Sequence, residues 1–186
     1  GSLSMLHYFI VSMFIAALMT GRTPELGSKK LDLHEIILAA VSFLSTSFTS
    51  LVFAAIAISV PAGLATLGNS GPHGLTEMLY AFTSTSINNG SVMAGLKINT
   101  PLINLTTAIA MLTGRHAVLL IGLLIGGSIA RKGQIAISAA SLPVASPLFI
   151  AMVVGVIIIM SALTFFPALA LGPVLEHLFL LAGGIF

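Results

Sequence analysis

From Ile36 to Val60 the chain carries no charged side chain. A bilayer core about 30 Å thick is crossed by roughly 20 apolar residues in a helix, so this stretch is long enough to span a membrane. Composition agrees, because 57% of the residues are hydrophobic and only 6% are charged, whereas roughly a quarter of the residues of a soluble domain are charged. So few charges cannot cover a globule of 186 residues with polar surface. We therefore predict an all-α integral membrane protein.

Hydropathy divides the rest of the chain into further apolar runs. Spans are predicted over residues 3–20, 36–60, 102–130 and 146–171, the third interrupted at Gly114-Arg115-His116. The tail after Pro173 is too short to cross and is expected at the interface. The run 75–86 is shorter still and, at about 1.5 Å per residue, reaches only part of the way across the bilayer. It predicts a re-entrant half-helix between the second and third spans.

Basic side chains set the predicted orientation. Five of the seven Lys and Arg residues lie in the loops 22–35 and 131–134, and the positive-inside rule places both loops in the cytoplasm. Both ends of the chain and the segment that follows the half-helix then face outward. The net charge of +2 is small and dispersed, which argues against nucleic-acid binding, and the chain has no Cys for disulfides or thiolate metal sites.

The stretch "TSTSINNGSVMAGLKINTP", residues 83–101, is polar and carries one charge, Lys97. Non-helical backbone at membrane depth is tolerated only where it is buried in protein or lines water. A half-helix directs its partly negative carbonyl end inward, and a returning loop can offer backbone carbonyls in place of an ion's hydration shell. Gly90, Gly95 and the pair Asn88-Asn89 suit such a backbone. An ordinary hairpin loop outside the membrane is the alternative that these residues leave open.

The segment "GPHGLTEMLYAFTSTSINNGSVMAGLKINTP", with "GRTPE" before it and "ALTFFPALALGPV" after it, resembles the potassium-binding subunit of the Kdp-type potassium-transporting ATPase. The resemblance covers nearly the whole chain and the C-terminal part of that subunit, whose four span–pore-loop–span units surround one pore. It implies that residues 1–35 are the last span of the preceding unit with a cytoplasmic loop. Residues 36–130 would be a complete unit, and residues 131–186 a loop, the terminal span and an interfacial tail.

The resemblance also implies which residues bind potassium, mainly through backbone oxygens. They form one selectivity-filter strand and are Ser86, Ile87, Asn88, Asn89, Gly90 and Ser91. The family usually has three consecutive Asn where this chain has "INN". Ile87 is tolerable there if the position contributes only its carbonyl, and it alters selectivity if the side chain braces the filter.

Three further side chains are expected to act around this strand. Arg115 lies within an apolar segment, where a charge is expensive unless it faces protein or water. It is either a barrier or gate in the ion pathway, as the family implies, or a structural Arg that binds carbonyls freed by a break at Gly114. Glu77 and Thr83 are expected to support the half-helix, with Glu77 complementing the helix dipole from the first turn.

No nucleotide-binding loop and no "DKTGT" phosphorylation motif occurs in the sequence. We therefore expect a non-hydrolytic subunit with no cofactor and with potassium as the transported ion. The resemblance implies as partners the remaining pore units, an ATP-hydrolysing P-type subunit and small accessory membrane subunits, in the plasma membrane of a bacterium or archaeon. A self-contained homotetrameric potassium channel and an assembly element without transport activity are the alternatives.

Overall fold

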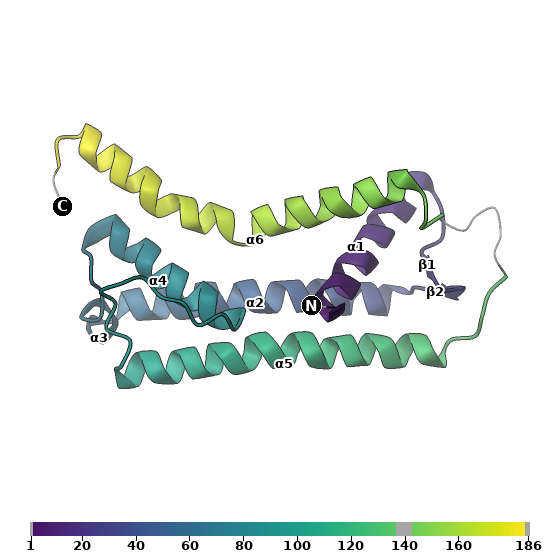
Figure 1. Ribbon diagram of the computed structural model, residues 1–186, viewed down its shortest axis with the longest axis horizontal. Coiled ribbons are helices and arrows are strands. Elements are labelled where there is room, and N and C mark those ends of the chain that lie inside the picture. Colours follow the sequence, from purple (N-terminus) through teal and green to yellow (C-terminus); the bar gives the residue numbers. More distant parts are fainter. Residues whose placement is uncertain (1, 137–142, 185–186) are drawn as a thin grey trace. The chain divides into compact units, whose positions relative to one another are not determined.

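The computed structural model of the protein describes residues 2–136 and 143–184 (Figure 1). Four of its helices contain apolar stretches long enough to cross a membrane, and sheet is limited to one two-stranded hairpin in the described residues. The predicted class, an all-α membrane protein with several spans, is therefore confirmed. In chain order the elements are α1 (Ser2–Thr20), β1 (Glu25–Leu26), β2 (Lys29–Lys30), α2 (Leu33–Ser59), α3 (Pro61–Leu64), α4 (Gly71–Ser86), α5 (Pro101–Arg131) and α6 (Pro147–Leu181).

The chain divides into two compact units. Unit 1 comprises Gly1–Leu44 and Ala117–Ser161, and unit 2 comprises Ser45–His116 and Ala162–Phe186. The core of unit 1 is apolar and includes the edge-to-face ring pair Phe9 and Phe149, whose centroids are 5.3 Å apart. Its buried members are Ile10, Met13, Ala16, Leu31, Ala39, Ile125 and Phe149.

The strands of unit 1 form a tight antiparallel hairpin that the sequence patterns do not predict. Gly27 and Ser28 join β1 to β2, with φ angles of 56° and 63°. Positive φ at both central residues is the geometry of the two-residue hairpin turn. The hairpin places the Lys29 ammonium 2.9 Å from the Ile129 carbonyl and 3.1 Å from the Ala130 carbonyl, where it binds the C-terminal end of α5.

A charged cluster also joins the two polar loops within unit 1. The Lys132 ammonium lies 2.8 Å from Asp32, 2.7 Å from Glu35 and 3.0 Å from the Lys30 carbonyl. Burial disfavours the charged form of Lys132, but its hydrogen bonds to Asp32 and Glu35 outweigh this and raise its pKa. Ser128 donates a further hydrogen bond to Glu35. The two loops that were predicted to share one side of the membrane are therefore in contact, and which side they face stays a prediction.

Unit 2 is built around helix α4. Its core includes Met78, Leu79 and Phe82 of α4, which pack with residues of α2 and α5. The Phe82 ring stacks on Phe53, with the centroids 6.1 Å apart. One face of α4 is therefore buried against two of the long helices, which holds the helix by side-chain packing along its length.

Several predicted boundaries were wrong, each for a local reason. The half-helix begins at Gly71 and not at residue 75, because Pro72 lies in the first helical turn, where its missing N–H has no partner to lose. The third span is one uninterrupted helix through Gly114. The fourth helix continues to Leu181 and contains Pro167 and Pro173, since each proline removes only one backbone donor from a long apolar run.

Candidate functional site

Directly after α4 the backbone leaves the right-handed helical conformation and takes positive φ angles at two residues. Ile87 caps the helix with φ −90° and ψ 5°, Asn88 has φ 61°, and Gly90 has φ 78°. Positive φ is open to glycine and is tolerated by Asn, so the prediction made from these residue types is confirmed at Asn88 and Gly90. Gly95, with φ 101°, follows the same prediction.

Every backbone N–H from residue 87 to residue 91 donates a hydrogen bond to the last turns of α4. Such an arrangement directs five consecutive donors to one side of the segment and attaches the segment to the helix end. The bonds run from Ile87 to the Thr83 carbonyl (3.2 Å), from Asn88 to the Thr85 carbonyl (2.9 Å), from Asn89 and Gly90 to the Ser84 carbonyl (2.8 and 3.4 Å), and from Ser91 to the Ser84 hydroxyl (2.8 Å).

The backbone carbonyl oxygens of residues 87–91, unlike the N–H groups, do not bind to α4. Within the part of the chain that the structure describes, no hydrogen bond engages a carbonyl of residues 87–91. Right- and left-handed residues in succession turn neighbouring N–H groups toward one side, which leaves the carbonyls on the other. Because Ile87, Asn89, Gly90 and Ser91 are exposed, these oxygens are available to a ligand.

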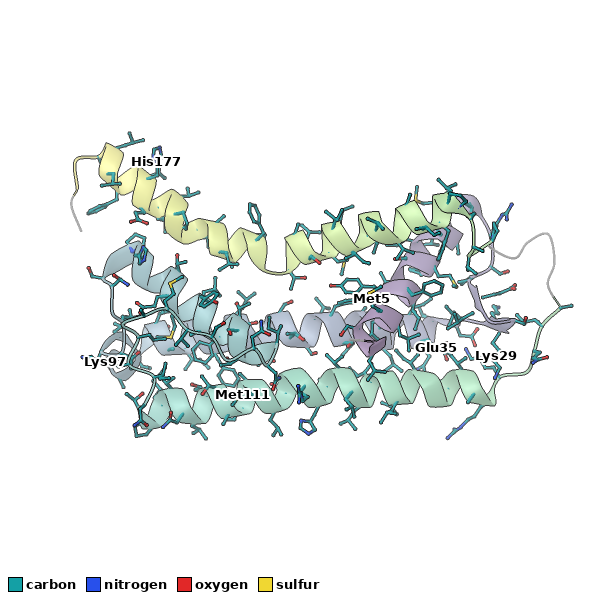
Figure 2. The ribbon with its side chains drawn as sticks, in the orientation of Figure 1. Met5, Lys29, Glu35, Lys97, Met111 and His177 are labelled. Carbon is teal, nitrogen blue, oxygen red and sulfur yellow. The ribbon has the colours of Figure 1, made fainter. Side chains whose placement is uncertain are left out.

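Helix α5 contacts the start of this segment through its backbone. The Asn88 side-chain amide donates to the Met111 carbonyl at 3.2 Å (Met111 is labelled in Figure 2). One turn further on, a Cβ placed on Gly114 would lie 1.8 Å from the Ser86 carbonyl oxygen. Only a residue without a side chain allows α5 to approach the end of α4 this closely. The sequence pattern predicted a helix interruption at Gly114 and gave no sign of this close contact.

Arg115 follows this contact directly. Its side chain is exposed, and α5 continues unbroken through it. The alternative that Arg115 binds carbonyls freed by a break at Gly114 is therefore wrong. An exposed guanidinium therefore lies one residue beyond the point where α5 contacts the end of α4.

Glu77 lies in the second turn of α4 and not in the first, because the helix begins earlier than predicted. Its side chain is fully buried. One carboxylate oxygen accepts the N–H groups of Gly68 and Asn69, both at 3.1 Å, and the Asn69 side-chain amide at 3.5 Å. Glu77 therefore fastens the connector between α3 and α4 instead of capping the dipole of the helix.

The same connector contacts the chain that follows residues 87–91. The Lys97 N–H donates to the Thr66 carbonyl at 2.8 Å, and a Cβ on Gly68 would lie 2.9 Å from the Gly95 carbonyl carbon. The Lys97 side chain is exposed (Figure 2), and among the described residues no carboxylate pairs with it.

Two hydroxyl groups of α4 contact the hydroxyl of Ser91, the last residue of the segment, and this contact was not predicted from the sequence. The Tyr80 and Ser84 hydroxyls each lie 2.9 Å from the Ser91 hydroxyl. Their spacing of four residues on a helix, which puts both on one face, was the available signal. Thr83, predicted to support the helix, has a buried hydroxyl without a hydrogen-bond partner in the described residues.

The described residues contain no group of three His, Asp or Glu side chains that could hold a metal ion. Neutral backbone oxygens are thus the ligands that this region offers to a cation. They suit a large monovalent ion better than a divalent one, which prefers carboxylate ligands.

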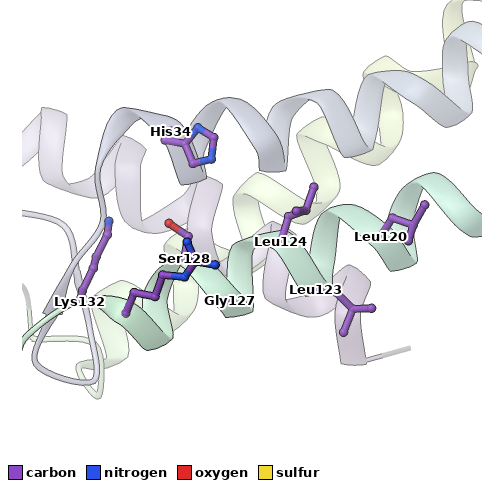
Figure 3. A pocket seen from close by; sticks show the side chains of 8 residues that line it. His34, Leu120, Leu123, Leu124, Gly127, Ser128 and Lys132 are labelled. Atoms are coloured by element: carbon purple, nitrogen blue, oxygen red, sulfur yellow. The ribbon is translucent and has the colours of Figure 1, made fainter.

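Unit 1 contains a separate open groove of about 800 Å³ (Figure 3). Leucines of α5 form much of its wall, and Lys132 at one end is already bound to Asp32 and Glu35. None of the predicted site residues lines it. The lining residues are His34, Leu120, Leu123, Leu124, Gly127, Ser128, Arg131 and Lys132.

Comparison with known proteins points to one family. The family model of the potassium-transporting ATPase A subunit matches residues 1–178. The chain is 45% identical over 186 residues to the potassium-transporting ATPase potassium-binding subunit of Mesorhizobium japonicum, and 49% identical over 186 residues to that of Methylobacterium radiotolerans. Each alignment covers 100% of this chain and 33% of the relative, so the chain spans about a third of the length of these curated relatives. With nearly all of its residues matched, the chain belongs to the potassium-transporting ATPase A subunit family.

Proposed function

We propose that this chain contributes one selectivity-filter strand, residues 86–91, to the channel-like, potassium-binding subunit of an ATP-driven potassium importer. It binds and conducts potassium and does not hydrolyse ATP. The relatives carry the name of the potassium-binding subunit, and the match of a third of their length supports a role as part of a pore. The remaining pore units, an ATP-hydrolysing P-type subunit and small accessory membrane subunits are the proposed partners.

The observation that carries the proposal is the two-sided segment after α4. Its N–H groups are hydrogen-bonded to the helix, while its carbonyl oxygens make no hydrogen bond in the described chain. A row of carbonyls in place of the hydration shell is how potassium-selective filters bind their ion. The C-terminal end of α4 adds a partial negative charge at the same place.

The exposed side chain of Ile87 supports a backbone-only role at this position. Its N–H caps α4, and its carbonyl belongs to the unbonded row. The side chain that braces the strand is the neighbouring Asn88, through Met111. We infer that Ile87 replaces Asn there without removing a filter contact.

The orientation proposed from the positive-inside rule puts the loops 22–35 and 131–134 in the cytoplasm of a bacterial plasma membrane. The contact of Lys132 with Asp32 and Glu35 supports a shared side for the two loops. The filter segment then faces outward, where potassium would enter.

Substituting Gly90→Ala tests the filter. Ala at φ 78° costs roughly 1–2 kcal/mol in backbone energy, although the site has open space. In the full-length subunit assembled with its ATPase partner, we expect the potassium concentration for half-maximal ATPase activity to rise about tenfold, which corresponds to about 1.4 kcal/mol. Gly27→Ala is the matched control, since Gly27 also has a positive φ and open space, but lies in the hairpin of unit 1. Equal effects of the two substitutions, or none at Gly90, would contradict the proposal.

Arg115 is proposed as a positive barrier to passive flow beyond the filter. Arg115→Gln removes the charge and should raise ATP-independent rubidium uptake into proteoliposomes about tenfold, as the loss of a repulsion of about 1.4 kcal/mol requires. Arg131→Gln, on the same helix, is the control and should leave this uptake unchanged. High passive uptake by the unsubstituted protein without ATP would favour the homotetrameric channel instead.

A further inference from the structure

We propose that Tyr80, Ser84 and Ser91 form a hydroxyl brace that sets the position of the far end of the filter strand and thereby its preference for potassium over sodium. The inference rests on the proposed function of residues 86–91. It adds two positioning residues on α4, Tyr80 and Ser84, outside that strand. All three residues lie in unit 2.

Ser84 is the central attachment point of the strand. Its carbonyl accepts the N–H groups of Asn89 (2.8 Å) and Gly90 (3.4 Å), and its hydroxyl accepts the N–H of Ser91 (2.8 Å). One residue thus holds the backbone of three consecutive filter residues. Its side chain is 3% exposed, so water does not compete freely for these bonds.

Ser91 is held a second time, through its own hydroxyl. That oxygen lies 2.9 Å from the Ser84 hydroxyl and 2.9 Å from the Tyr80 hydroxyl. A hydroxyl can donate one hydrogen bond and accept two. A chain in which Tyr80 donates to Ser91 and Ser91 donates to Ser84 satisfies both contacts. Ser91 is thereby held at its N–H by Ser84 and at its hydroxyl by Ser84 and Tyr80, which lie one turn apart on α4.

The two ends of the strand are attached differently. Ile87 and Asn88 bind to helix carbonyls, which every residue type supplies. The N–H of Ser91 instead binds to the hydroxyl of Ser84, which a substitution at position 84 can remove. The position of the Ser91 end therefore depends on residue identity at 80, 84 and 91.

Loss of this brace changes the positions of the backbone carbonyl oxygens of the strand but removes none of them. Filters distinguish potassium from sodium by the spacing or by the number and field strength of their coordinating oxygens. A looser strand can close around the smaller sodium ion, while conduction of potassium continues. Reduced selectivity with retained maximal turnover is the expected signature.

The experiment uses the full-length subunit in the assembled transporter, with ATPase activity measured over ranges of potassium and sodium. For Ser84→Ala the ratio of half-saturating sodium to half-saturating potassium should fall about tenfold, and for Tyr80→Phe about threefold, with maximal turnover in potassium within twofold of the parent. In the double variant the ratio of half-saturating sodium to half-saturating potassium should fall no further than in Ser84→Ala, because both substitutions act through Ser91. Ser84→Thr keeps the hydroxyl and should restore most of the ratio.

Matched controls are available on the same chain. Tyr8→Phe removes the other tyrosine hydroxyl, and Ser59→Ala removes an exposed serine hydroxyl that binds the Ala55 carbonyl within its own helix. Neither should change the ratio. If Ser84→Ala fails to assemble, Tyr80→Phe decides the question on the same readout.

An unchanged ratio in Tyr80→Phe and Ser84→Ala, or a fall in turnover without a change in ratio, would overturn the brace. Gly90→Ala separates this outcome from failure of the proposed function. If Gly90→Ala weakens potassium activation while the hydroxyl variants keep the ratio, the filter assignment stands and only the brace is wrong. If Gly90→Ala has no effect, the filter assignment itself fails.

Discussion

Gly114→Ala is expected to destabilise the fold and to weaken potassium activation more than any other single methyl addition in α5. The new Cβ would lie 1.8 Å from the Ser86 carbonyl oxygen and 2.8 Å from its carbon. Both atoms belong to backbone at the start of the proposed filter strand, so no flexible side chain can move aside. Overpacking of this kind costs about 1–3 kcal/mol and occasionally more.

Helix propensity acts in the opposite direction at Gly114. Alanine is favoured over glycine by about 1 kcal/mol inside a helix, so a net loss of about 2 kcal/mol is the expected sum of that gain and the upper end of the overpacking penalty. Displacement of the Ser86 carbonyl should also raise the half-activating potassium concentration more than tenfold. Thermal stability in detergent and potassium-stimulated ATPase activity measure the two effects.

Gly126→Ala is the matched control for Gly114→Ala. Gly126 lies in the same helix, and a Cβ there meets no atom within 4 Å. We expect this variant to be unchanged or more stable by up to about 1 kcal/mol, because only helix propensity acts. Similar behaviour of the two variants would show that α5 does not contact the end of α4 as described.

Glu77→Ala is expected to have the largest effect on stability. The Glu77 carboxylate is fully buried and accepts three N–H donors from Gly68 and Asn69. Its removal leaves these donors without their acceptor, and an unsatisfied buried donor costs about 1–3 kcal/mol. A loss of about 3 kcal/mol is therefore expected, with loosening of the connector that contacts Gly95 and Lys97.

Glu77→Gln separates charge from hydrogen bonding. Only one carboxylate oxygen of Glu77 is bonded, and the other has no partner in the described residues. A glutamine can place its carbonyl at the bonded position and its amide at the other, so we expect it to retain most of the stability. The midpoint of heat-induced loss of the size-exclusion peak is a suitable measure, since the chain contains no Trp for intrinsic fluorescence.

Glu176→Ala provides the control for both substitutions. Glu176 is 33% exposed and lies 3.6 Å from His73, a contact expected to contribute at most about 1 kcal/mol. A loss as large as that of Glu77→Ala would mean that carboxylate removal in general, and not the connector, determines stability. A stable Glu77→Ala protein would contradict the structural role assigned to Glu77.

Hydropathy and residue type predicted much of the fold and of the backbone conformation after α4. The charge-free stretch from Ile36 to Val60 became most of α2, because a bilayer accepts little else than a helix of that length. The pair of amides before Gly90 predicted left-handed backbone, which the structure has at Asn88. These features depend on local chemistry, and a local pattern was sufficient to find them.

Other predictions failed at helix boundaries, and one failed because the deciding contact was distant in sequence. Gly114-Arg115-His116 was interpreted as an interruption, yet the helix continues and Gly114 is required by the neighbouring end of α4. The last span was predicted to end at residue 171, but α6 continues through Pro173 to Leu181. Glu77 was placed in the first turn because Pro72 was not recognised as the helix start.

The sequence by itself determined that this chain is a multi-span helical membrane protein, and its residue order carried the family resemblance and the location of the polar segment 83–101. Only the tertiary structure decided which backbone groups of residues 87–91 bind to α4 and which make no hydrogen bond in the described chain. Five N–H groups bind to α4 and five carbonyls do not, and this division depends on how α4, α5 and the returning chain pack. Hydropathy reports the transfer of each residue from water into an apolar phase, whereas these contacts join backbone and hydroxyl groups whose partners are set by folding.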